Sequence, residues 1–174
     1  KMRDKAEKET GEKKDYFVNI SAETKEMIKR ARLVKNYGFK YIMIDLVTVG
    51  WAGAQTIRDE CEDLKLAIHA HRAMHATFTR NKKHGISMLT LAKCARLLGV
   101  DNIHVGTVVG KLVGTKEDVS VLNDAMERNK SRGYFEQEWG KIKETISVSS
   151  GGLHPGLVPA LVKTVSGYAK HEKK

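Results

Sequence analysis

Cationic side chains gather directly after two short apolar segments of the sequence. Residues 68–75 read Ile-His-Ala-His-Arg-Ala-Met-His, so three histidines and one arginine fall within eight residues. In the second segment, His104 lies on the apolar run and Lys111 follows on a loop with three glycines between residues 106 and 114. Arginine and histidine bind phosphate through charge-assisted hydrogen bonds, and a loop lysine can stabilise negative charge that develops during a reaction. These residues indicate a site for a sugar bisphosphate.

The His69-Ala-His71 spacing leaves a metal site open, because alternate residues of a strand point to the same side. Against a metal, no carboxylate or cysteine nearby completes a ligand set, and Arg72 would repel a cation. His69 can instead be a hydrogen-bonded residue of the interior. A buried Arg72, together with His71 and His75, needs an anionic partner. That partner is either a bound phosphate or an internal Asp or Glu.

Three further candidates also have plainer interpretations. His104 alone could be a core residue, but Lys111 follows on a loop whose glycines give it the backbone freedom of an active-site lid. The segment Ser149-Ser-Gly-Gly152 precedes a helix and can present backbone N–H groups to a phosphate, although such turns are also ordinary loops. Asp45 ends a strand, where it either orients a histidine or makes a buried hydrogen bond.

The composition is that of a single soluble, cytoplasmic domain of 174 residues. The charged start is no signal peptide, and no apolar run approaches the roughly 18 residues of a membrane span, so we expect no membrane partner. Cys61 and Cys94 are expected to be reduced thiols on helices. The net charge of +10 raises the question of nucleic acid. However, lysines are dispersed among glutamates and aromatics make up only 6% of residues, so we expect no nucleic-acid partner.

Strands and helices alternate along the chain and must position these residues. We expect strands over 15–20, 41–47, 66–69, 102–105 and 145–149. The helices are expected over 1–13, from Ser21 to just before Gly38, over 51–63, over 86–98, from a capping box at Thr115 and Asp118, and around 157–168. Residues 127–143 break the pattern and are predicted to be a surface insertion. Its aromatic patch from Tyr134 to Trp139, with Phe135, is predicted to pack rather than to recognise a partner.

This alternation predicts an α/β fold with five parallel strands and right-handed crossovers. A doubly wound sheet and a partial (β/α)8 TIM barrel both fit, since a whole barrel needs about 250 residues and about eight strands. In either fold, active sites form at the carboxyl ends of the strands, where the polar clusters lie.

The ordered set His71-Arg-Ala-Met-His75, Ile103–Lys111 and Ser150-Gly-Gly152 resembles the large subunit of ribulose-bisphosphate carboxylase/oxygenase (Rubisco). The amino-acid sequences of residues 79–85 and 152–156 are most similar to those of archaeal forms of the family (form III or II/III). The resemblance implies that residues 1–174 are an incomplete (β/α)8 barrel, from about helix 2 to helix 7. The amino-terminal domain and barrel strands 1, 2 and 8 would then be absent.

The resemblance also implies roles for individual residues. His71 corresponds to a catalytic histidine that handles protons. Lys111 corresponds to the lysine of the sixth barrel loop, which closes over the substrate and stabilises the carboxylate formed from CO₂. The residues implied for ribulose 1,5-bisphosphate are Arg72 and His104 at one phosphate, Ser150 at the sugar backbone, Gly151 and Gly152 at substrate or the other phosphate, and His75 in support.

The implied cofactors are Mg²⁺ and a CO₂ molecule bound as a lysine carbamate. The family's Lys-Asp-Asp-Glu metal motif occurs nowhere in this sequence, and we expect it just upstream of Lys1. Without the metal, the substrate would have no Lewis acid for enolisation. We therefore expect a metal site outside these residues and no CO₂ fixation by them alone.

For the whole parent protein, the resemblance implies a carbon–carbon lyase that adds CO₂ or, as a monooxygenase, O₂ to ribulose 1,5-bisphosphate. It also implies a homo-oligomer and a place in nucleotide (AMP) metabolism. Two alternatives stay open: a Rubisco-like isomerase or enolase for another phosphorylated ketose, and a non-catalytic truncated barrel for binding or assembly. Rubisco-like relatives commonly lose the loop lysine or substrate residues, so the presence of Lys111, Arg72 and His104 favours the carboxylase.

Overall fold

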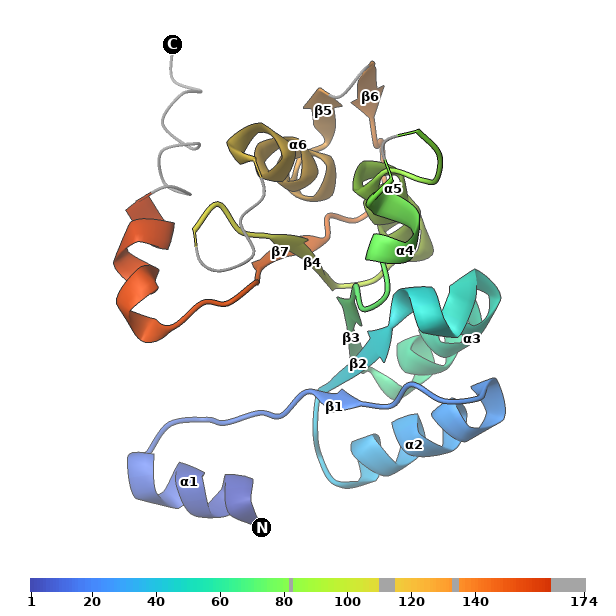
Figure 1. The fold of residues 1–174 in the computed structure, drawn as a ribbon. Helices are drawn as coiled ribbons and strands as arrows, with labels where there is room; N and C mark the ends of the chain where they lie inside the picture. Colours follow the sequence, from blue (N-terminus) through green and yellow to red (C-terminus); the bar gives the residue numbers. More distant parts are fainter. Residues whose placement is uncertain (82, 110–114, 133–134, 164–174) are drawn as a thin grey trace. The chain divides into compact units, whose positions relative to one another are not determined.

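The computed structural model describes residues 1–81, 83–109, 115–132 and 135–163. The chain divides into two compact units, Lys1–Thr77 and Phe78–Lys174, each with parallel strands and packed helices (Figure 1). The short helix α4 (Ala76–Thr79) lies at the division. None of the helices in the described ranges has the length and apolar character needed to cross a membrane.

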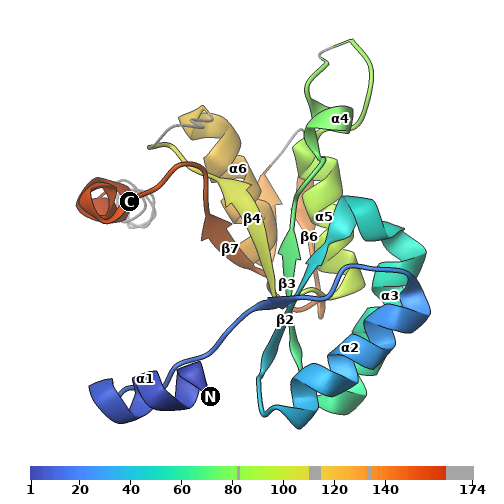
Figure 2. The same ribbon diagram turned by 60° about the horizontal axis from the view of Figure 1, so that its bottom comes forward.

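In the first unit, β1 (Val18–Asn19), β2 (Tyr41–Asp45) and β3 (Ala67–His71) lie side by side and parallel. The helices are α1 (Met2–Thr10), α2 (Thr24–Asn36) and α3 (Leu46–Leu64). Helices α2 and α3 pack on each other and cover the strands from one side (Figure 2). The buried apolar residues of these elements form the core of the unit, and they include Met27, Ala31, Ile42, Ile44, Ala54, Ile57, Ile68 and Ala70.

Helix α2 begins later than predicted. The expected first residue, Ser21, lies outside the helix, which starts at Thr24 after its N-cap Glu23. The Ser21 hydroxyl instead accepts a hydrogen bond from the Asp45 N–H, with 2.7 Å between the oxygen and the nitrogen. The prediction was wrong because serine caps helices and strand ends by the same kind of hydrogen bond.

Helix α3 begins earlier than predicted, and the strand before it is shorter. Strand β2 ends at Asp45 instead of residue 47, and α3 starts at Leu46 instead of residue 51. A kink at Gly50, with φ 76° and ψ 163°, joins two helical segments. The apolar residues after Asp45 resemble a continuing strand because helix and strand cannot be distinguished by apolar character alone in a short run.

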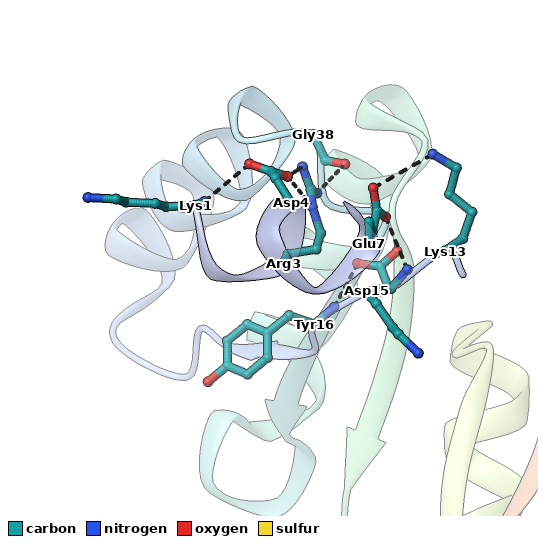
Figure 3. A network of polar contacts seen from close by, with 9 residues as sticks. Lys1, Arg3, Asp4, Glu7, Lys13, Asp15, Tyr16 and Gly38 are labelled. Atoms are coloured by element: carbon teal, nitrogen blue, oxygen red, sulfur yellow. Dashed lines mark hydrogen bonds and ion pairs between the residues drawn. The ribbon is translucent and has the colours of Figure 1, made fainter. Parts of the chain in front are cut away.

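Helix α1 carries no buried residue and is attached by polar contacts. Figure 3 shows Arg3 reaching from α1 to the Gly38 carbonyl, which accepts a hydrogen bond from Arg3 Nη1 at 3.2 Å. The guanidinium also lies over the Phe39 ring, 4.7 Å from its centroid. Exposed polar contacts of this kind contribute little to stability, so α1 is only weakly attached to the rest of the unit.

In the second unit, β4 (Asn102–Gly106) pairs in parallel with β7 (Ile146–Ser149), while α5 (Met88–Leu98) packs on α6 (Lys116–Glu127). The capping residue predicted for α6 is confirmed, since Thr115 Oγ1 accepts a hydrogen bond from the Asp118 N–H at 3.1 Å. The chain continues through the 3₁₀ helix η1 (Pro155–Leu157) into a helical stretch over 158–163. The remainder of the helix predicted around 157–168 lies outside the described residues.

The stretch predicted as an insertion, residues 127–143, contains an antiparallel hairpin of β5 (Lys130–Arg132) and β6 (Glu136–Glu138). Trp139, directly after β6, is 3% exposed and stacks on Arg96 of α5, whose guanidinium carbon lies 4.3 Å from the ring centroid. Tyr134 lies outside the described residues. Trp139 therefore packs, as predicted, whereas Phe135 of the same patch is 85% exposed, so the packing prediction is wrong for that residue.

Arg96 is a buried charge, only 1% exposed, that joins several segments of this unit. Its Nη1 donates to the carbonyls of Ala125 at 2.8 Å and Arg128 at 2.7 Å. Its Nε and Nη2 donate to the carbonyls of Lys143 at 3.1 Å and Ile142 at 3.4 Å. The positive charge thus satisfies carbonyls at the carboxyl end of α6, where the helix dipole is negative, and carbonyls of the segment before β7.

Replacing Arg96 by methionine is expected to lower the free energy of unfolding by about 3 kcal/mol, because the buried and partly buried carbonyls that it binds lose their donor. Urea denaturation followed by tryptophan fluorescence measures this change. The matched control is Arg32→Met on α2, since Arg32 makes a bidentate but exposed pair with Glu60. Equal unfolding midpoints for the two variants would contradict this role of Arg96.

Candidate functional site

The histidine motif lies at the carboxyl end of β3, which reaches His71 rather than ending at residue 69 as predicted. The register of the two strands places Asp45, the last residue of β2, opposite His71. Asp45 Oδ1 is 3.0 Å from His71 Nδ1. Of the two roles left open for Asp45 by the sequence, the structure therefore shows contact with a histidine.

His69 is a residue of the interior, with 4% of its surface exposed. Its ring lies 5.1 Å from that of Phe17, centroid to centroid. In the ranges that the structure describes, no group of three or more His, Cys, Asp or Glu side chains is arranged to hold a metal ion. The His69-Ala-His71 spacing is thus explained by one packed histidine and one histidine bonded to a carboxylate.

Arg72 and His75 lie on the turn that follows β3. The His75 N–H donates to the Arg72 carbonyl at 3.1 Å, and Met74 closes the turn with φ 66°, a left-handed conformation that is uncommon for a residue with a side chain. The turn therefore holds Arg72 and His75 at the end of the strand that also carries His71.

The guanidinium of Arg72 is half-buried, and burial lowers its pKa. An arginine nevertheless keeps its charge in proteins. Among the described residues, no side chain or carbonyl makes an ion pair or hydrogen bond with this guanidinium. Of the two partners that the sequence leaves open for Arg72, an internal Asp or Glu is therefore not found in the part of the chain described.

The charge of Arg72 also acts on its neighbour His75. Burial lowers the pKa of His75, and the positive charges of Arg72 and His71 lower it further. His75 is consequently neutral at pH 7, and Arg72 provides the fixed positive charge of the turn. A partly desolvated guanidinium beside a neutral imidazole is suited to bind an oxyanion through a fork of N–H donors.

In the second unit, the candidate residues lie at the carboxyl ends of the neighbouring strands β4 and β7. A bulge between His104 and Gly106 shifts the register, so that Gly106 lies opposite Ser149. The Ser150 N–H then donates to the Gly106 carbonyl at 3.1 Å. Gly106 has φ 95°, a conformation that glycine adopts without steric cost. The bulge thus brings the turn after β7 to the end of the strand that carries His104.

The turn after β7 requires its glycines. Gly151 has φ 125° and Gly152 has φ 68°, and both values would strain a residue with a side chain. Ser150 at the start of the turn is partly buried. Lys111, the predicted loop lysine, lies outside the described residues, so the structure describes the candidate site without it.

Two functional candidates were missed by the sequence analysis. Asn19 at the end of β1 donates from Nδ2 to Asp45 Oδ2 at 3.2 Å, and Ser21 binds the Asp45 N–H. The available signal was that Asn19 and Ser21 directly follow an apolar segment, as Asp45 and His71 do. The sequence pattern instead predicts Ser21 only as the start of a helix.

Comparison with known proteins agrees with the predicted resemblance. The family model described as "Ribulose bisphosphate carboxylase large chain, catalytic domain" matches residues 1–169. The ribulose bisphosphate carboxylase of Pyrococcus abyssi is 51% identical over 163 residues, which cover 94% of this chain and 36% of that protein. The Methanocaldococcus jannaschii carboxylase is 50% identical over 167 residues, covering 93% of this chain and 39% of that protein. The chain therefore spans a little more than one third of the length of these relatives.

Solved structures give the same result. The octameric Rubisco of Pyrococcus horikoshii, crystallised with sulfate, is 51% identical with a TM-score of 0.83, covering 93% of this chain and 36% of that chain. The dimeric archaeal Rubisco of Hyperthermus butylicus is 44% identical with a TM-score of 0.85, covering 93% of this chain and 39% of that chain. The predicted α/β fold with five parallel strands is confirmed, and it is consistent with a partial (β/α)8 barrel. The shared motifs, the fold and the match over residues 1–169 together show that this chain belongs to the Rubisco large-chain family and corresponds to part of its catalytic domain.

Proposed function

We propose that this chain is part of a ribulose-1,5-bisphosphate carboxylase/oxygenase. The whole protein would add CO₂ or O₂ to the enediolate of ribulose 1,5-bisphosphate, with 3-phosphoglycerate as product. The observation that carries the proposal is the half-buried Arg72, for which the described residues supply no carboxylate, next to the paired His71 and Asp45. The identity of about one half to curated carboxylases supports the same reaction.

In this proposal, the substrate is held mainly through its phosphates. Arg72 and His104 would bind one phosphate and Ser150 the sugar backbone, while the backbone at Gly151 and Gly152 would meet the substrate or the other phosphate. The Arg72 guanidinium, with no ion-pair partner among the described residues, supports this assignment in the first unit. In the second unit, it is supported by the hydrogen bond from Ser150 to the end of the strand that carries His104.

The chemical steps would use His71 and Lys111. His71 would transfer protons during conversion of the substrate, with His75 in support as a neutral neighbour. Lys111 would stabilise the carboxylate that forms from CO₂, since an ammonium group favours developing negative charge. Both roles come from the matching family motifs.

Mg²⁺ and a lysine carbamate belong to the proposal for the whole protein. When bound, the metal would act as the Lewis acid that promotes enolisation of the substrate. Among the residues that the structure describes, no three ligand side chains are arranged to hold it. We propose that the family's Lys-Asp-Asp-Glu motif, which does not occur in this sequence, would supply the ligands elsewhere in the whole protein. We also propose a homo-oligomer, because the solved relatives include an octamer and a dimer.

Replacing Arg72 by glutamine is expected to raise the pKa of His75 towards its usual value of 6.5, because one of the charges that oppose protonation is lost. Because the pKa of His75 is lower in the folded chain than in the unfolded chain, the stabilising contribution of the neutral ring is fully present above pH 6.5. This contribution is lost as the pH falls through the pKa that His75 has in the folded chain. Proton NMR titration of the histidine ring measures the shift.

The control for this experiment is Lys29→Gln, which removes the same charge from an exposed site on α2. In the same spectra, inorganic phosphate is expected to bind Arg72→Gln about tenfold more weakly than the unchanged chain. An unchanged His75 titration together with unchanged phosphate binding in Arg72→Gln would argue against an anion site at this turn.

The natural reading frame that contains these residues, expressed whole, is expected to incorporate labelled CO₂ into 3-phosphoglycerate. Arg72→Gln should raise the KM for ribulose 1,5-bisphosphate about tenfold, because a bidentate phosphate contact is lost. Arg32→Gln is the control with equal charge. Isomerisation of a phosphorylated ketose without CO₂ incorporation would favour a Rubisco-like enzyme, and binding without turnover would favour a non-catalytic role.

A further inference from the structure

Polar residues from three adjacent strand ends of the first unit form one hydrogen-bonded chain. Asn19 ends β1, Asp45 ends β2 and His71 ends β3, and these strands are neighbours in the sheet (Figure 1). Asn19 Nδ2 donates to Asp45 Oδ2 at 3.2 Å, while Asp45 Oδ1 lies 3.0 Å from His71 Nδ1. Each carboxylate oxygen of Asp45 therefore has a different side-chain partner.

The orientation of Asn19 is fixed by Ser21. The Ser21 N–H donates to Asn19 Oδ1 at 3.0 Å, so the amide oxygen is occupied and the amide NH₂ group is directed to Asp45. The Ser21 hydroxyl accepts the Asp45 N–H at 2.7 Å, which holds the backbone of the same residue. The Asp45 side chain is 24% exposed, so this carboxylate is held in a largely enclosed position.

These contacts determine which nitrogen of His71 carries a proton. An ionised carboxylate only accepts hydrogen bonds, so its contact with Nδ1 requires a hydrogen on Nδ1. The Ala73 N–H lies 3.2 Å from the same Nδ1 and would require a lone pair there. A hydrogen bond to a charged group is roughly twice as strong as a neutral one, so the contact with Asp45 prevails. In the neutral ring, the basic lone pair is then on Nε2.

This arrangement bears on proton transfer because it leaves one defined nitrogen of the ring to exchange a proton. Asp45 is the carboxylate in contact with the ring, through Nδ1. The carboxylate therefore sets the tautomer in which Nε2 carries the basic lone pair.

We propose that Asp45 is a positioning residue that directs the basic nitrogen Nε2 of His71 to the substrate, and that Asn19, held by Ser21, orients Asp45. This inference rests on the proposed function, which assigns proton transfer to His71. It adds two residues to the machinery of the reaction, both of which act through the histidine rather than on the substrate.

The test replaces Asp45 by asparagine and determines the tautomer of His71 by ¹⁵N NMR of histidine-labelled protein. The amide oxygen of Asn19 is bonded to the Ser21 N–H, so Asn19 presents only its NH₂ group to residue 45. That NH₂ group should bind the amide oxygen of the new asparagine, whose own NH₂ group then faces His71 Nδ1. An NH₂ donor requires a lone pair on Nδ1, and the hydrogen is therefore expected to move to Nε2. In the whole protein, kcat should fall at least about tenfold with little change in KM.

The double variant Asp45→Asn with Asn19→Asp separates positioning from a structural effect. The carboxylate at position 19 would accept the NH₂ group from position 45, so that the amide oxygen faces His71 and the hydrogen returns to Nδ1. We expect the original tautomer and a partial recovery of kcat. The matched control is Asp59→Asn on α3, where Asp59 accepts a hydrogen bond from Gln55 on the same helix, and neither tautomer nor kcat should change.

The variant Asn19→Ala gives a second measurement if Asp45→Asn does not fold, because it removes only the contact to Oδ2. We expect a smaller loss of kcat with the tautomer retained. A His71 hydrogen that remains on Nδ1 in folded Asp45→Asn, or an unchanged kcat in Asn19→Ala, would overturn the inference. The tautomer measurement needs no turnover, so absence of CO₂ fixation by the unchanged whole protein would refute the proposed function separately.

Discussion

The pairing of β2 with β3 is the constraint on which the chemistry of the first unit depends. Ile42 and Ile44 on β2 and Ile68 on β3 are fully buried, so a shift of one residue would move these side chains out of the core. Hydrophobic burial therefore fixes the register, and the register places Asp45 opposite His71. A carboxylate and an imidazole are brought to hydrogen-bond distance by packing that involves neither of them.

Arg96 is fully removed from water and Arg72 is partly removed from it, and their surroundings differ. Arg96 is surrounded by peptide carbonyls and by the ring of Trp139, so its hydrogen-bonding capacity is used within the fold. The Arg72 guanidinium is half-buried, but it makes no ion pair or hydrogen bond with any of the described residues. The first arrangement stabilises structure, whereas the second keeps a charge available for a ligand. Residue type alone does not distinguish the two.

Much of the organisation was predictable because it is encoded locally. Apolar runs marked the strands, Thr115 marked the start of α6, and the sequence from His71 to His75 marked a cluster at a strand end. The family resemblance was also predictable, since long motifs remain recognisable without any knowledge of contacts. The boundaries around Ser21 and Asp45 were less accurate, because short polar and apolar segments there are compatible with more than one element.

The sequence by itself determined the order of the elements, the family and the residue types that gather at strand ends. Only the tertiary structure decided that Asp45 contacts His71, that Asn19 and Ser21 hold Asp45, and that Arg96 is a structural charge. The physical reason is distance along the chain. Asn19 and Asp45 are 26 residues apart, as are Asp45 and His71, and their contacts exist only after buried side chains have aligned three strands.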